Sequence, residues 1–235
     1  MDFFSHLVNE DKLHENFKRI LLKNDKLAQD LFNEWASEFV DRDNKIIKEF
    51  QTSFNSTFWE VYLYAALKHY GLNIDFTFSS PDFCIPDAQI VIEATTANAA
   101  KDRTPEWDKN YTTEEIEKLN RFGEMNREAI IRLSSAIKQK ERKYSSSYSK
   151  LEHVKGKAFV LAVAPFEQPY FNLQYDRAIR AVLYSDYINE DVYLDNPELY
   201  PDGPPSQHLD YITKDNGTEI PLGFFAMINM KILAQ

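Results

Sequence analysis

The segment from Pro81 to Thr95 constrains the fold more than any other part of this chain. It consists of two short apolar runs around a Pro-Asp pair, a pattern that predicts a β-hairpin turning at Pro86-Asp87. One carboxylate, Asp82, precedes the first run, and another, Glu93, ends the second. With a two-residue loop, Asp82 lies opposite Val91, so Asp82 and Glu93 become diagonal neighbours on one face of the hairpin.

Asp82 and Glu93 are therefore candidate ligands of a metal ion. Two carboxylates that converge beside β-branched residues repel each other and lose hydration unless a cation or a proton lies between them. A hard divalent cation is the partner that such oxygens prefer. The alternative is a half-exposed hairpin with solvated charged ends, because motifs this short also match by chance.

The helix expected before the hairpin carries a single charge over most of its length. Helical spacing extends from about Ser53 to Tyr70, and Glu60 is the only charged residue from Gln51 to Ala66. A helix that is apolar nearly all round is packed on most sides, so Glu60 is expected to be at least partly buried. Its carboxylate then needs a cation, a network of donors or a proton. A hydrogen bond to a core tyrosine or tryptophan is the alternative to a role in a site.

The remaining apolar patterns indicate an α/β chain. Residues 1–50 have mostly three- and four-residue spacing, which predicts one or two packing helices without any chemistry. A strand is expected over Leu72–Phe78 and a long helix over about Asn126–Tyr144. The continuous apolar run Ala158–Ala164 predicts a central strand covered on both faces, and a helix from about Asn172 to Tyr184 follows it.

The C-terminal part has a different composition. From Ser185 to Asp210 there are seven acidic residues, four prolines and no lysine or arginine, which predicts a long surface excursion. Asn216-Gly217 then predicts a hairpin turn, with a second strand over roughly Ile220–Met230. We find no internal repeat and no linker, so a single domain over residues 1–235 is expected.

The composition indicates a folded protein of the cytoplasm. Hydrophobic residues make up 43% of the chain and aromatic residues 14%, which argues against disorder. Cys84 is the only cysteine, which excludes an intramolecular disulfide and a cysteine-rich zinc site. The N-terminus lacks a basic region followed by an apolar run, and no segment approaches the length of a membrane span. We therefore expect a cytoplasmic location and no membrane partner.

Charge is unevenly distributed along the chain. The net charge of -10 argues by itself against a polyanionic partner. Between Arg132 and Lys157, however, eight lysines and arginines stand against two glutamates, a local charge of +6 that leaves -16 on the rest. This basic stretch can contact the backbone of a nucleic acid. The alternative is an ordinary solvated helix face and loop.

The long helix places one lysine of this stretch on its inward face. The apolar positions that include Ile130 and Ile137 continue at Lys140, whereas Lys138 and Arg142 point to other faces. A lysine at such a position either covers the edge of the core with its aliphatic chain or reaches a site on the sheet.

The order of these elements resembles the core of the PD-(D/E)xK nuclease superfamily, which has the restriction-endonuclease-like fold. The matching residues are Glu60 on the first helix, Pro81-Asp82 on the second strand and Glu93-Ala94-Thr95 on the third. The resemblance implies a mixed central sheet flanked by helices, with a helical extension before it and a β-hairpin after it. The extension, the nuclease-like core and the acidic excursion with its hairpin would comprise residues 1–50, 54–184 and 185–235.

The resemblance also implies a metal site. Asp82, Glu93 and the backbone carbonyl of Ala94 would hold Mg²⁺ or Mn²⁺, with Glu60 as a direct or water-mediated ligand. Asp82, Glu93 and Glu60 would then also be catalytic residues.

One residue departs from the superfamily pattern. Thr95 stands where the pattern has a lysine, two residues after the glutamate, and threonine cannot place a positive charge beside the attacking water. Some members supply the lysine from another element, commonly the following helix. Lys140 is therefore the first candidate for this role here, and Lys138 is the second.

The function implied is that of a metal-dependent nuclease that hydrolyses phosphodiester bonds, of DNA in the first place, in restriction or defence. Lys138, Arg142 and Lys143 would contact the nucleic acid, and a homodimer would allow both strands to be cut. Two alternatives remain open. Thr95 favours a catalytically inactive module of the same fold that binds nucleic acid or protein. An unrelated α/β protein whose acidic tail binds a partner protein predicts no effect of divalent metals on stability.

Overall fold

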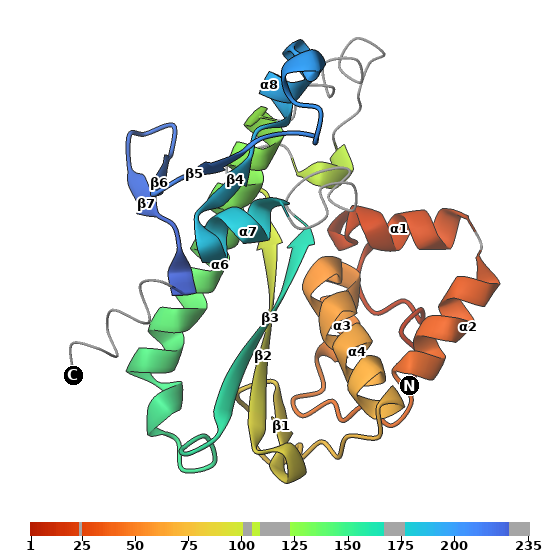
Figure 1. The fold of residues 1–235 in the computed structure, drawn as a ribbon. Coiled ribbons are helices and arrows are strands. Elements are labelled where there is room, and N and C mark those ends of the chain that lie inside the picture. Colours follow the sequence, from red (N-terminus) through yellow and green to blue (C-terminus); the bar gives the residue numbers. More distant parts are fainter. Residues whose placement is uncertain (24, 101–104, 109–122, 167–176, 226–235) are drawn as a thin grey trace. The chain divides into compact units, whose positions relative to one another are not determined.

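The computed structural model has the expected α/β class. It describes residues 1–23, 25–100, 105–108, 123–166 and 177–225. The chain divides into two compact units, of which the first comprises residues 1–96 and 139–164 and the second residues 97–138 and 165–235 (Figure 1). The single domain expected from the sequence stays a prediction.

The first unit begins with a group of short helices built on phenylalanine. The sequence predicts one or two helices before the apolar helix that carries Glu60, and the structure has three α-helices there. They are α1 (Glu15–Leu22), α2 (Lys26–Trp35) and α3 (Ile46–Thr52). Phe3, Phe17 and Phe50 are fully buried among them, and the rings of Phe32 and Phe50 stack with centroids 4.3 Å apart. The phenylalanines of the N-terminal region thus form a core, as expected of packing helices.

Helix α4 (Phe54–His69) confirms the predicted apolar helix and its end. Gly71 follows it at a φ of +71°, the left-handed conformation in which glycine commonly terminates helices. Val61 of α4 is fully buried and packs with Phe83 and Ile92 of the hairpin, so α4 covers one face of the hairpin. Glu60 is half-buried on this helix, as expected.

The hairpin is present, but its register differs from the predicted one by two residues. Strands β1 (Phe83–Ile85) and β2 (Ile90–Asn98) are antiparallel, with Ile85 opposite Ile90. The loop has four residues because Pro86 opens the 3₁₀ turn η2 (Pro86–Ala88). A two-residue hairpin turn needs positive φ angles that proline cannot adopt. Because the loop length is even, Asp82 and Glu93 stay on the predicted face of the hairpin. When the same ladder is extended by one pair, Asp82 lies directly opposite Glu93.

The strand predicted over Leu72–Phe78 is wrong, because this segment forms only one bridge, between Asp75 and Cys84. The side chain of Asp75 accepts a hydrogen bond from the backbone N–H of Thr77 at 2.8 Å, and this local turn ends the pairing. The chain then reaches Asp82 through an irregular segment.

The main sheet is mixed, as expected, and has the order β1-β2-β3. Strand β3 (Ala158–Phe166) lies beside β2, and the arrows of the two point the same way in Figure 1. Among the strands that the structure describes, β3 is at the edge of the sheet, and Val160 is 41% exposed. The prediction of a central strand covered on both faces was therefore wrong here, because a short apolar run does not reveal which strands flank it.

The second unit contains most of the long helix and a set of short strands. Helix α6 (Gly123–Ser146) confirms the predicted long helix, although its last residues belong to the first unit. Helix α7 (Arg177–Tyr184) is the described part of the helix predicted from about Asn172, whose first residues lie outside the described ranges. No described helix has the length and apolar character needed to cross a bilayer.

The acidic excursion is more regular than expected. It contains β4 (Asp186–Ile188) paired with β5 (Ser206–His208), and the short helix α8 (Glu190–Asp195). The predicted C-terminal hairpin is formed by β6 (Tyr211–Thr213) and β7 (Glu219–Pro221). Strand β7 ends nine residues before the predicted Met230, because the described chain leaves the strand after Pro221 and Gly223 has a φ of +75°. Positions 226–230 lie outside the described residues.

Candidate active site

Glu93 is a buried carboxylate in the middle of β2, with 2% of its surface exposed. Its Oε1 atom accepts hydrogen bonds from the ammonium groups of Lys140 at 2.6 Å and Lys143 at 3.2 Å, and from the hydroxyl of Tyr148 at 3.2 Å. Lys140 thus lies on the inward face of α6, as its position in the apolar stripe predicts. The buried negative charge is balanced by two cations, as burial of a carboxylate requires.

The other oxygen of Glu93, Oε2, is buried and has no hydrogen-bond partner among the residues that the structure describes. A buried acceptor without a partner costs free energy, and in native proteins such atoms commonly mark an ion or water site. Three donors hold Oε1 in place, so the orientation of Oε2 is fixed as well. Glu93 therefore offers one preoriented oxygen to a further cation.

Asp82 lies beside Glu93, directly before β1. Its Oδ2 accepts the backbone N–H of Ala94 at 2.7 Å, which fixes the carboxylate across the ladder. Burial, and next the negative charge of Glu93, raise the pKa of Asp82 to about 6, against the opposing effects of the Ala94 N–H, Lys140 and Arg42. Ala94 thus contributes its backbone N–H to the site. The role of its carbonyl as a metal ligand stays a prediction.

The segment before Asp82 is held by contacts from other parts of the first unit. The ring of His153 stacks on Phe78 with centroids 3.8 Å apart, and its Nε2 lies 2.8 Å from the carbonyl oxygen of Ser80. Arg42 donates to the carbonyl of Phe78. These contacts replace the missing strand and give Asp82 a defined position.

Glu60 belongs to α4, which covers the face of the hairpin opposite to that of Asp82 and Glu93. Burial, and next the charge of Asp82, raise the pKa of Glu60 to about 7, whereas Arg42 opposes the rise. Glu60 and Asp82 line the same pocket, which has a volume of about 250 Å³. Since Asp82 interacts with both glutamates, it connects Glu60 to Glu93.

The described residues do not form a metal site that all three carboxylates share. They contain no group of three or more histidine, cysteine, aspartate or glutamate side chains close enough to hold one metal ion. The unpaired Oε2 of Glu93 and the raised pKa of Asp82 are both features that a bound cation would relieve. The direct or water-mediated role of Glu60 stays a prediction.

Sequence reasoning missed three side chains that the structure brings to these carboxylates. Lys143 was considered only for contact with nucleic acid, although it follows Lys140 by three residues and so shares its side of α6. Burial and the charge of Glu93 raise the pKa of Tyr148 above its ordinary value. Tyr148 and Arg42 belong to segments with no pattern that could have indicated a site.

The basic stretch is less open than its charge suggests. Lys138 donates to the carbonyl of Pro221 at 3.2 Å, and Lys155 pairs with Glu152. Lys157 donates to the sulfur of Cys84 at 3.2 Å, while Arg142 is exposed. Several of the cations counted in the sequence are thus engaged within the chain, and fewer remain for a nucleic acid.

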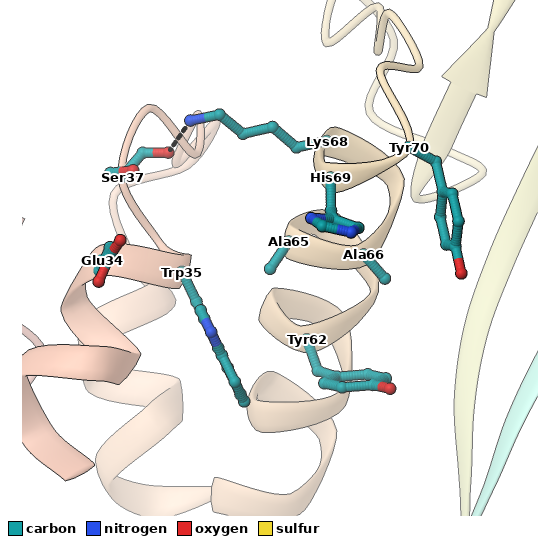
Figure 2. Close-up of a pocket in the computed structure, with 9 residues that line it drawn as sticks. All are labelled: Glu34, Trp35, Ser37, Tyr62, Ala65, Ala66, Lys68, His69 and Tyr70. Atoms are coloured by element: carbon teal, nitrogen blue, oxygen red, sulfur yellow. Dashed lines mark hydrogen bonds between the residues drawn. The ribbon is translucent and has the colours of Figure 1, made fainter.

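A larger hollow, of about 630 Å³, lies between α2 and α4 (Figure 2). Trp35 points toward the turn of α4 that carries Tyr62, and the ammonium of Lys68 reaches the carbonyl of Ser37 at 3.4 Å. Glu34 is the only carboxylate among the described residues that line it. The described residues that line this hollow include no pair of acids and no buried cation, so we do not propose a catalytic site there.

The comparisons with known proteins add no relative. No family model, no curated protein and no solved structure matches the chain. The resemblance to the PD-(D/E)xK superfamily therefore stays an expectation that depends on the residues described above.

Proposed function

We propose that this chain is a metal-dependent nuclease of restriction-endonuclease-like fold that hydrolyses phosphodiester bonds of DNA. The observation that carries the proposal is the asymmetry of Glu93. Its Oε1 is held by Lys140, while its buried Oε2 has no hydrogen-bond partner within the described part of the chain. Neighbouring carboxylates can hold a divalent cation for metal-assisted hydrolysis, and a half-buried lysine beside them can act on the attacking water.

In the proposed reaction the carboxylates and Lys140 have different roles. Asp82 and Glu93 would hold Mg²⁺ or Mn²⁺, and the ion would lower the pKa of its bound water and neutralise the charge that develops on the phosphate. Lys140 would orient the attacking water and stabilise its deprotonated form. Its contact with Glu93 supports this role, because it compensates for Thr95 at the usual position of the lysine.

The exposed cations near this site would contact the backbone of the nucleic acid. Lys143 supports this best, since 49% of its side chain is exposed against 18% for Lys140. Lys138 and Arg142 would contact the same backbone. We also propose a homodimer that cuts both strands and a cytoplasmic location.

Cleavage of supercoiled plasmid, single-stranded DNA and RNA tests the proposal directly. We expect nicked or linear products from DNA with Mg²⁺ or Mn²⁺, and none with EDTA, because the carboxylates cannot activate water without the ion. Binding without cleavage on all three substrates would instead favour an inactive module of this fold. Cleavage that persists in EDTA would contradict the proposed site.

The substitution Lys143→Met is expected to weaken DNA binding moderately, by about three- to tenfold at low salt, because one phosphate contact is lost. The slope of log affinity against log salt should fall by about 0.9 for duplex DNA. Fluorescence anisotropy over a salt series measures both quantities. The matched control is Lys155→Met, since Lys155 is also exposed and also pairs with a glutamate, Glu152, whereas Lys143 pairs with Glu93 of the site. Equal effects of the two substitutions would contradict a specific role for Lys143.

A further inference from the structure

The pocket that contains Glu60 and Asp82 is completed by the N-terminal helices. Its wall includes residues of the connection between α2 and α3, a region in which the sequence indicated no chemistry. Five carboxylates line this pocket in the described chain: Asp41, Asp43, Glu49, Glu60 and Asp82. Arg42 is the only basic side chain among its described lining residues.

Two of the five carboxylates are already engaged elsewhere. Asp41 accepts the backbone N–H groups of Lys45 at 3.1 Å and Ile46 at 3.3 Å, at the start of α3. Asp43 pairs with the ammonium of Lys45 at 2.8 Å. Arg42 is therefore the cation that faces the remaining acids, of which Glu60 and Asp82 are the least solvated.

Arg42 is also held in a defined position. Its Nη1 donates to the carbonyl of Phe78, in the segment that leads to Asp82. The guanidinium carbon lies 6.0 Å from the centre of the Phe76 ring, at the outer limit of a cation–π contact. The side chain is half-buried, so its charge is screened less than that of a surface arginine.

We propose that Arg42 is the built-in counter-cation of this carboxylate pocket and a positioning residue that sets its affinity for divalent metal. This inference rests on the proposed function, since it concerns the same metal site. The guanidinium balances the charge of Glu60 and Asp82 when no metal is bound. A divalent cation that binds at Asp82 must enter beside this positive charge, and the repulsion weakens its binding.

Titration of Mn²⁺ into the metal-free full-length protein, followed by calorimetry at pH 8.5, tests the inference. Arg42→Gln removes the charge but keeps an N–H donor for the Phe78 carbonyl, and it is expected to bind Mn²⁺ about tenfold more tightly than the wild type. Arg42→Lys keeps the charge and should stay within about threefold of the wild type. The control Lys45→Gln changes a cation of the same connection that pairs with Asp43, and it should leave the affinity unchanged.

The outcomes separate this inference from the proposed function. Unchanged or weaker Mn²⁺ binding in Arg42→Gln overturns the counter-cation role and leaves the nuclease proposal intact. A wild type that binds no Mn²⁺ overturns both. Tighter binding in Arg42→Gln supports the inference even if the wild type cleaves no nucleic acid. Circular dichroism checks folding, and Arg42→Met, which keeps an aliphatic chain of similar length, is the second neutral variant if the glutamine variant does not fold.

Discussion

Substitution of Lys140 by methionine is expected to lower the rate of DNA cleavage by about 10³-fold while Mn²⁺ still binds. The ammonium of Lys140 lies 2.6 Å from Glu93 and is the best placed group to orient the attacking water. A side chain in such a role contributes about 10²- to 10⁴-fold to the rate. Methionine keeps a similar length and packing but has no charge. Single-turnover cleavage at saturating DNA measures the rate, and calorimetry measures metal binding.

The neighbours of Lys140 make this a test of chemistry rather than of folding. Glu93 keeps Lys143 and Tyr148 as donors when Lys140 is replaced, so its buried charge retains a partner. The matched control is Lys155→Met, whose ammonium pairs with Glu152 instead of Glu93. We expect the control to cleave within about threefold of the wild type. Equal rates for Lys140→Met and the wild type would contradict the proposed role of Lys140.

The same variant distinguishes the two main alternatives. An inactive module of this fold shows no cleavage in the wild type, and Lys140→Met then changes only stability or binding. If the wild type cleaves and Lys140→Met does not, the lysine missing at Thr95 has been supplied by α6. The position of Lys140 beside Glu93, two residues before Thr95 in β2, is the structural basis of that expectation.

The contact between Lys140 and Glu93 could be predicted because both residues belong to regular elements. The helical period places Lys140 on the same side of α6 as Ile137, and the period of a strand places Glu93 on the face of Asp82. The loop of the hairpin was predicted two residues too short, yet an even error leaves every side chain on the predicted face. Periodicity therefore predicted which groups meet, and the loop determined that Asp82 and Glu93 are direct rather than diagonal neighbours.

Arg42 and Tyr148 could not be predicted in the same way. Arg42 lies in the connection between α2 and α3, and it contacts the carbonyl of Phe78, 36 residues later in the chain. Tyr148 follows α6 in a 3₁₀ turn, η4 (Tyr148–Lys150), within a serine-rich segment that has no period. Such positions depend on the packing of distant segments, which spacing along the chain does not encode.

The substitution Glu60→Gln is expected to stabilise the protein at pH 8.5 while it weakens or abolishes activity. The pKa of Glu60 is raised from 4.5 to about 7 by burial and by Asp82, with small contributions from Glu49 and Glu93 and an opposing one from Arg42. Between these two values the folded protein binds more protons than the unfolded chain. The free energy of unfolding of the wild type therefore falls as the pH rises through this window.

The magnitude follows from the size of the pKa shift. A shift of this size corresponds to about 3 kcal/mol at most, and partial solvation reduces it, so a gain of about 2 kcal/mol is expected for Glu60→Gln at pH 8.5. The gain should vanish near pH 4, where Glu60 is protonated in both the folded and the unfolded chain. Thermal unfolding at a series of pH values measures it, as an increase in melting temperature of about 5 °C at pH 8.5.

Mn²⁺ should reverse the order of the melting temperatures of the wild type and Glu60→Gln. The ion relieves the repulsion among the carboxylates of the wild type, so it stabilises the wild type more than Glu60→Gln if Glu60 contributes to its binding. The control Glu49→Gln lies on α3 in the wall of the same pocket but is exposed, and it should change the melting temperature little. Destabilisation by Glu60→Gln at pH 8.5 would mean that Glu60 is a structural acceptor. Stabilisation together with loss of cleavage would mean that the chain keeps a costly buried charge for its chemistry.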